Sequence, residues 1–223
     1  MFRKNNVQHL QTEVAGLVFP NPAGVPFVIH KTRFSWLHRA PEAGFLVLTP
    51  PSHEEVLPWI HGLSGERESA ILAVDIKTDI VRSFSLVYDF ADFIIIDPDS
   101  DMGIDAVDIS DIQSLLDELV SLRLCYERYT PVFLRLAHGT SPDELKILLG
   151  ACRLNGLDGV VVSHLSMLGT VRELTQGRVP VICRVNTPEE GLQALEGGAS
   201  LLELPDAKPL GKLLKALENK QEI

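Results

Sequence analysis

The chain has 223 residues, of which 45% are hydrophobic, so it can bury one sizeable core and lies near the lower size limit of an eight-stranded α/β barrel. Its formal net charge of -10 argues against nucleic acid and anionic membranes as partners, because both are bound through concentrated lysine and arginine. No apolar stretch approaches the roughly 20 residues of a membrane span, and the amino terminus lacks a signal-peptide core, so we expect a cytoplasmic protein.

Short apolar runs alternate with helix-like segments along most of the chain. Before the first run, residues 13–24 are predicted to form two extended pieces around a Pro/Gly turn, a hairpin that closes the bottom of a barrel. Each run is too short for a buried helix and ends at or directly before a polar residue, as is typical of parallel strands buried on both faces. The runs are Pro26 to His30, Phe45 to Thr49, Ile71 to Asp75, Phe93 to Asp97, Val132 to Ala137, Gly159 to Ser163, Val179 to Arg184 and Ser200 to Glu203.

The segments between these runs carry signals of helix starts and ends. Ser141 and Thr187 are each followed by a proline and two carboxylates, which is typical of a capped helix amino terminus. The predicted helices are Asp79 to Phe90, Asp108 to Tyr129, one that opens at Ser141, one from Thr187 to Gly197, and Ala207 to Lys220, whereas His53 to Gly65 permits a helix or a loop. The pattern predicts a single (β/α)8 TIM barrel domain over residues 1–223, with residues 1–25 as an N-terminal extension and hairpin.

Polar residues gather at the carboxyl ends of the predicted strands, where α/β barrels build their binding sites. They are His30, Lys31, Thr49, Ser52, His53, Asp75, Lys77, Asp97, Asp99, Arg135, His138, Ser163, His164, Arg184, Asn186, Glu203 and Asp206. Because side chains alternate along a strand, Arg135 points away from the side taken by its leucine neighbours. It is expected to pair with Asp97 or Asp75 inside the barrel, to contact a ligand, or to lie on an exposed edge. Lys31 either meets an anionic ligand or is a solvated residue at the start of a helix.

Histidines and cysteines are the candidate metal ligands in this sequence. His30, His138 and His164 follow non-adjacent strands and, together with an aspartate, resemble the ligand sets of barrel hydrolases. The His-x-His pattern expected at the first strand is missing, so we predict no metal. The three cysteines, Cys125, Cys152 and Cys183, lack disulfide or metal spacing, and we expect each to be a buried apolar residue in a reducing compartment.

Several segments together carry a family resemblance. They are Asn21-Pro-Ala-Gly24 followed by Lys31, Ala91 to Ser100, Pro131 to Ala137, Asp158 to His164, Val179 to Asn186 and Gly198 to Glu203. In this order they resemble motifs of the dihydroorotate dehydrogenases, FMN-binding barrels of pyrimidine biosynthesis. The resemblance runs from Asn21 over most of the chain.

The resemblance implies roles for individual residues. Lys31 stands at the first-strand lysine, Ser100 at the catalytic base and Asp97 at an asparagine that contacts orotate, so these three are the expected catalytic residues. Arg135 stands at a flavin-contacting lysine, and His164 joins Asp97 as an expected substrate-binding residue. In this chemistry, dihydroorotate would lose a proton to Ser100 and a hydride to the flavin.

The implied cofactor is FMN. Its expected contacts are Lys31, Thr49, Arg135, Ser163, Arg184 and Asn186. The chain departs from the family where the phosphate binds, because Cys183-Arg-Val-Asn186 replaces a glycine-rich turn and Asp206 replaces a small hydroxyl residue. Arg184 can offset the added negative charge with a bidentate contact to phosphate.

Three functions stay open at this point, and with them the question whether the chain is an enzyme. The first is a dihydroorotate dehydrogenase-like oxidoreductase, and the second is a non-catalytic small-molecule-binding or subunit protein on the same fold. The third is a phosphate-sugar lyase or aldolase, whose Schiff-base lysine would be Lys31 or Lys77. The expected ligand is a small molecule in each case, and a homodimer stays open because related barrels often dimerise.

Overall fold

The computed structural model of this protein describes residues 10–27, 42–50, 52, 54, 71–98, 109–137 and 139–221. Its strands are β1 (Thr12–Val14), β2 (Leu17–Phe19), β3 (Ala23–Phe27), β4 (Phe45–Leu48), β5 (Ile71–Ile76), β6 (Phe93–Ile96), β7 (Val132–Leu136), β8 (Gly159–Val162), β9 (Val181–Arg184) and β10 (Leu201–Glu203). The described helices are α2 (Ile80–Val87), α4 (Ile109–Arg123), α5 (Pro142–Leu154), α6 (Leu165–Thr175), α7 (Pro188–Glu196) and α8 (Leu210–Gln221).

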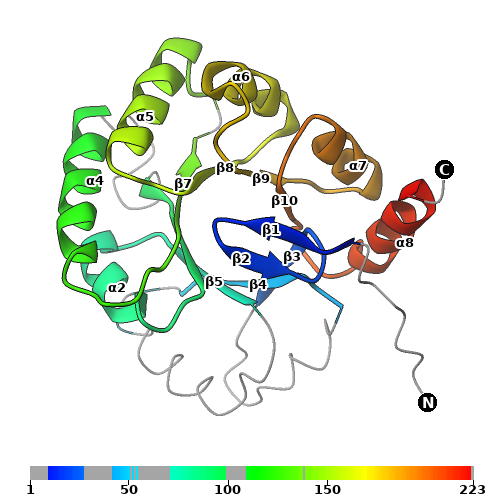
Figure 1. Cartoon of the computed structure of the whole chain (residues 1–223), viewed down its shortest axis with the longest axis horizontal. Helices are drawn as coiled ribbons and strands as arrows, with labels where there is room; N and C mark the ends of the chain where they lie inside the picture. The colour runs from blue at the N-terminus through cyan, green and yellow to red at the C-terminus, as the bar shows by residue number, and fades with distance from the viewer. Residues whose placement is uncertain are drawn as a thin grey trace.

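Strands β3 to β10 form a closed barrel in which chain neighbours are spatial neighbours and β10 pairs with β3. Every pairing in the ring is parallel. The helices lie outside the ring, and the β1–β2 hairpin lies across its opening (Figure 1). The predicted (β/α)8 barrel with an N-terminal hairpin is therefore confirmed. None of the helices in the described ranges is long and apolar enough to cross a membrane.

Two predicted helix caps agree with the structure, whereas the last helix begins at Leu210, three residues after the predicted Ala207. Ser141 caps α5 in a capping box, in which its hydroxyl accepts from the Glu144 amide while the Glu144 carboxylate accepts from the Ser141 amide. The Thr187 hydroxyl caps α7 by accepting from the Glu190 amide at 3.1 Å, while the Glu190 carboxylate accepts from the amide of Asn186, one residue earlier. The helix predicted to reach Tyr129 ends earlier, at Arg123, and the chain then turns toward β7.

The first barrel strand begins at Ala23, three residues before the predicted Pro26, and the hairpin turn is not the predicted Pro/Gly segment. The turn is Ala15-Gly16, where both residues have positive φ angles of 51° and 78°. Asn21 starts the barrel: its Oδ1 accepts from the Ala23 amide at 3.0 Å, and its Nδ2 donates to the Glu42 carbonyl at 2.7 Å. The asparagine of the predicted motif therefore has a structural role.

An aromatic layer fills the bottom of the barrel. Phe19 from the hairpin packs edge-on against Phe45 and Phe93, with ring centroids 5.6 and 5.9 Å apart, and Phe93 packs against Phe133. Because Phe45 and Phe93 open their strands, this contact places the hairpin at the amino ends of the strands. The expected cap at the bottom is confirmed, and the carboxyl ends form the opposite mouth of the barrel.

Two aspartates that precede strands hold the amino ends of neighbouring strands. Asp92 accepts from the Leu72 amide and Asp158 from the Val132 amide, each at 2.8 Å. Arg128 and Arg123 form ion pairs with these two carboxylates, respectively. These structural roles were not predicted from the sequence.

Candidate functional site

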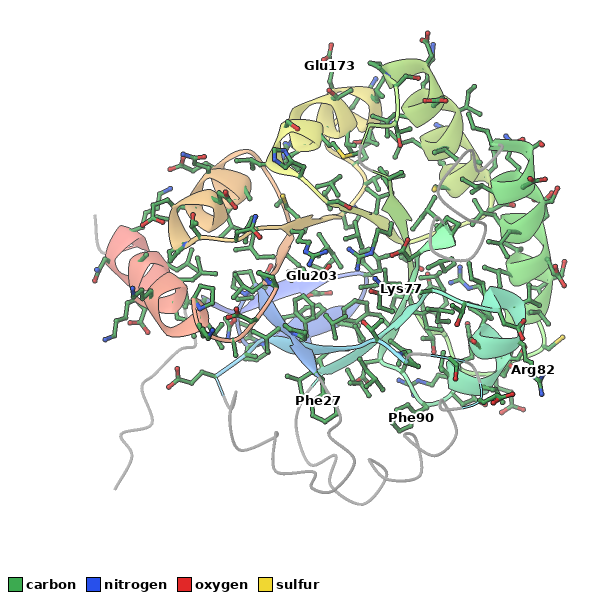
Figure 2. The ribbon with its side chains drawn as sticks, turned by 180° about the vertical axis from the view of Figure 1, so that it is seen from behind. Phe27, Lys77, Arg82, Phe90, Glu173 and Glu203 are labelled. Atoms are coloured by element: carbon green, nitrogen blue, oxygen red, sulfur yellow. The ribbon has the colours of Figure 1, made fainter. Side chains whose placement is uncertain are left out.

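Five ionisable side chains meet inside the barrel at the carboxyl ends of the strands. We call Asp75, Lys77, Asp97, Arg135 and Glu203 the Arg135 cluster, because each of the other four lies near Arg135 or near one of its partners. The strand pleat explains the position, since Phe133 faces the interior and Arg135, two residues later, faces the same way one step nearer the mouth. Figure 2, drawn from the side opposite the hairpin, shows Lys77 and Glu203 within the ring of strands.

Arg135 is the centre of the cluster. Its Nη1 donates to Glu203 Oε2 at 3.1 Å, and its Nη2 donates to Asp75 Oδ2 at 3.1 Å and to Glu203 Oε1 at 3.4 Å. Its Nε lies 3.4 Å from Asp97 Oδ2, close enough for attraction but not aligned for a hydrogen bond. The side chain is 7% exposed, so the predicted buried pairing is confirmed with both aspartates, and Glu203 is a third partner that the sequence reading did not assign.

Lys77 and Thr49 complete the surroundings of the two aspartates. The Lys77 ammonium lies 3.3 Å from Asp97 Oδ2 and 3.6 Å from Asp75 Oδ2, and its side chain is 33% exposed. The Thr49 hydroxyl donates to Asp75 Oδ2 at 3.5 Å. Lys77 is the most exposed member of the cluster and lies on its solvent side.

The charges of the cluster do not balance. Its carboxylates outnumber its two cations, so the cluster is negatively charged when every group is ionised. Burial raises the pKa of Asp75, and the carboxylates of Glu203 and Asp97 raise it further, while Arg135 and Lys77 oppose the shift. For Arg135, burial alone would lower the pKa, but the surrounding carboxylates outweigh it and raise the pKa.

The rim on the β8 side carries Ser163 and His164. Ser163 is half-buried, and its hydroxyl donates to the Leu136 carbonyl at 3.3 Å. His164 is the N-cap of α6, where its Nδ1 accepts from the Ser166 amide at 3.3 Å and lies 2.8 Å from the Ser166 hydroxyl. The exposed ring therefore lies at the mouth with one nitrogen used in capping.

The rim after β9 and β10 is where the resemblance implies the FMN phosphate. The Asn186 amide donates to Glu190 Oε2 at 2.7 Å, and the Asn186 side chain donates to the same oxygen at 3.4 Å. Asp206 accepts from the Lys208 amide at 2.7 Å. Arg184 is exposed at the end of β9. Two backbone donors at this end, the amides of Asn186 and Lys208, are thus already paired with carboxylates of the chain itself.

Several predicted residues cannot be placed. Lys31 and Ser100, two of the expected catalytic residues, lie outside the described residues, as do His30 and His138 of the histidine set. Within the described ranges, no group of three histidine, cysteine, aspartate or glutamate side chains is arranged to hold a metal ion.

The cysteines agree with the sequence prediction in part. All three are free, and Cys152 and Cys183 are buried as predicted. The prediction for Cys125 was wrong, because this residue follows the end of α4 and is exposed. Burial raises the pKa of the Cys183 thiol to about 11 and that of Cys152 to about 12, so neither resembles an activated nucleophile.

No protein-family model matches the sequence, and no curated protein matches it. Solved structures of similar fold include ligand-free DHODH (dihydroorotate dehydrogenase) from Eimeria tenella, with a TM-score of 0.80, 16% identity, and coverage of 98% of this chain and 89% of that chain. DHODH from the same organism in complex with ferulenol gives a TM-score of 0.78 at 14% identity, covering 98% of this chain and 86% of that one. The likeness shows that the chain has the barrel fold of these dehydrogenases, in agreement with the resemblance in its sequence.

Proposed function

We propose that this barrel binds a small molecule at the carboxyl ends of its strands, as a binding or subunit protein, and does not carry out the flavin-dependent oxidation of dihydroorotate. One observation carries the proposal: Arg135 is held by the carboxylates of Asp75, Asp97 and Glu203 in the mouth of the barrel. On the family resemblance, this arginine stands where a lysine contacts flavin, and Asp97 stands where an asparagine contacts orotate.

The cluster opposes both roles. To contact a flavin, Arg135 would have to leave three buried carboxylates, and removing one partner from a buried ion pair costs about 3–5 kcal/mol. An anionic substrate such as orotate would meet the excess negative charge of the cluster. Two like charges about 4 Å apart repel by about 4 kcal/mol at the effective dielectric near a protein surface. The site therefore disfavours anions.

The implied FMN phosphate does not fit the other side of the mouth. A phosphate is held by free amide donors and positive charge at a helix amino terminus. At the start of α7, the Asn186 amide is bonded to Glu190, the Glu190 amide is bonded to Thr187, and Pro188 has no amide hydrogen. Asp206 adds a second carboxylate after β10, and the exposed Arg184 can offset its charge but does not supply backbone amide donors. We derive no flavin chemistry for this chain.

The lyase alternative has less support than the binding role. A Schiff base requires a lysine that is free to attack a carbonyl, whereas Lys77 forms ion pairs with Asp75 and Asp97. Lys31, the other candidate, lies outside the described residues. The cytoplasmic location and the homodimer stay predictions.

The test is flavin binding by the purified protein. We expect a colourless protein that shows no heat of binding with FMN in calorimetry and no oxidation of dihydroorotate with added FMN. The matched double variant is Glu190→Ala with Asp206→Ser, which frees the Asn186 amide and removes two carboxylates. We expect this variant to bind FMN more tightly than the wild type does. A yellow protein as purified, or wild-type binding to FMN as tight as that of the variant, would overturn the proposal.

A further inference from the structure

The Arg135 cluster contains two buried polar atoms, Asp75 Oδ1 and Arg135 Nε, that have no hydrogen-bond partner in the described part of the chain. The two residues are 2% and 8% exposed, respectively. A buried carboxylate oxygen without a donor is unfavourable, and native proteins normally satisfy such atoms with water, an ion or a ligand. Asp75 therefore offers an acceptor at the mouth of the barrel that the described residues leave unused.

The contacts of Lys77 indicate which chemical group would satisfy this acceptor. Its ammonium lies between Asp75 and Asp97 and contacts one oxygen of each, Oδ2 in both cases. A protonated nitrogen thus already occupies part of the space between the two aspartates. Lys77 is also the most exposed member of the cluster, so its side chain can move aside while the more deeply buried Arg135 and Glu203 stay paired.

The charge of the cluster favours a cation and disfavours other ligands. Because the carboxylates outnumber Arg135 and Lys77, a cation compensates negative charge and can replace the charge of Lys77 when that side chain moves aside, whereas an anion would increase the imbalance. A metal ion is disfavoured because the Arg135 guanidinium already lies among the carboxylates, and no three-ligand group is present among the described residues. A nitrogen cation differs from a metal in needing only hydrogen-bond acceptors.

We propose that Asp75 and Asp97 bind the protonated nitrogen of a small amine or amidine, and that Lys77 moves aside to admit it. The inference rests on the proposed small-molecule-binding function and names the ligand class of that same site. Asp75 Oδ1 accepts from the ligand nitrogen, and Asp97 supplies the second carboxylate. Arg135 keeps both carboxylates in place from below.

The experiment is an NMR titration of the full chain at pH 8 with propylammonium and acetamidinium, following the backbone amides of Asp75, Lys77 and Asp97. Propanol and propionate, of similar size but neutral or negative, are the control probes. We expect saturable shifts with the two cations only. Asp75→Asn should weaken binding about tenfold or more, as for loss of a charged hydrogen-bond partner. Lys77→Met should tighten binding, because it removes the competing ammonium.

Glu173→Gln is the matched control, since it removes one carboxylate from the outside of α6, at the edge of the molecule in Figure 2, and should change affinity less than about twofold. If Asp75→Asn does not fold, the opposite effect expected for Lys77→Met still decides the question. Equal shifts with propanol and propylammonium, or no shifts with either cation, would overturn the inference. If the wild type binds neither cation nor FMN, only this inference is refuted. If the wild type binds FMN, the proposed function is refuted.

Discussion

Replacing Arg135 with methionine tests whether the cluster is as tightly coupled as its geometry indicates. Methionine keeps an unbranched apolar side chain but removes the guanidinium that donates to Asp75 and Glu203 at 3.1 Å and lies 3.4 Å from Asp97. The carboxylates would be left buried with Lys77 as their remaining cation. Breaking a buried ion pair by removing one partner costs about 3–5 kcal/mol, so we expect a loss of that size in the free energy of unfolding at pH 8.

The loss should depend on pH in a definite direction. Without Arg135, the largest interaction that opposes the rise in the pKa of Asp75 is gone, so this pKa rises further above its ordinary value. A carboxyl whose pKa is higher in the folded state binds more protons there than in the unfolded chain, so stability falls as pH rises through that range. The variant should therefore lose less stability at pH 5 than at pH 8.

The assay is urea unfolding of the wild type and the variant at both pH values, followed by circular dichroism. Arg128→Met is the matched control, because Arg128 pairs with Asp92 at 3.3 Å but has a side chain that is 43% exposed. Its loss should be about 1 kcal/mol or less and similar at both pH values. An Arg135→Met loss no larger than that of the control, or one that grows as pH falls, would refute the coupling described for the cluster.

The remaining predictions concern single groups with defined surroundings. Because burial raises the pKa of Asp75, the stability of Asp75→Asn relative to the wild type should increase from pH 4 to pH 7. Urea unfolding measures this difference, and a difference that stays constant or decreases with pH would contradict the prediction. Gly24→Ala should lower the free energy of unfolding, measured by thermal unfolding, by about 1–3 kcal/mol, since the new Cβ would lie 2.1 Å from the Phe45 ring. Gly211→Ala is the control: its Cβ meets open space, so the variant should be as stable as the wild type or more stable. Of the three thiols, Cys125 alone should react with Ellman's reagent in the folded protein at pH 8, because burial raises the pKa of Cys183 to about 11, and rapid labelling of Cys183 would contradict its burial.

The barrel could be predicted because its strands are short, apolar and bounded by polar residues at the same end. This signal located seven of the eight barrel strands to within two residues at their starts, but it placed the first one too late. Residues Ala23 and Gly24 look like turn residues, and their place in a strand depends on packing: the Gly24 Cβ position lies against the Phe45 ring, and Asn21 bonds to the chain before β4. Such contacts between distant segments are invisible in a local pattern.

The candidate site was predicted in outline but not in its pairing. Alternation along β7 put Arg135 on the face opposite its leucine neighbours and named Asp75 and Asp97 as its candidate partners, but it left an exposed edge open as well. Glu203 was recognised only as a polar strand end, because β10 is separated from β7 by β8 and β9 and meets Arg135 across the interior. The reach of two long side chains across a closed ring depends on barrel geometry, which a strand pattern does not provide.

The barrel combines a bottom that is apolar with a mouth whose polar residues are coupled to one another. The bottom of the barrel is filled by apolar residues and the hairpin, so its packing does not involve the polar groups of the mouth. Within the mouth, however, the residues depend on one another: a buried arginine requires acids, and these acids require the arginine. An asparagine in place of Asp97 alone would leave Arg135 bound to Asp75 and Glu203. The polar residues of the mouth therefore depend on one another. Their ligand is better inferred from the charge of the whole cluster than from any one position in a family motif.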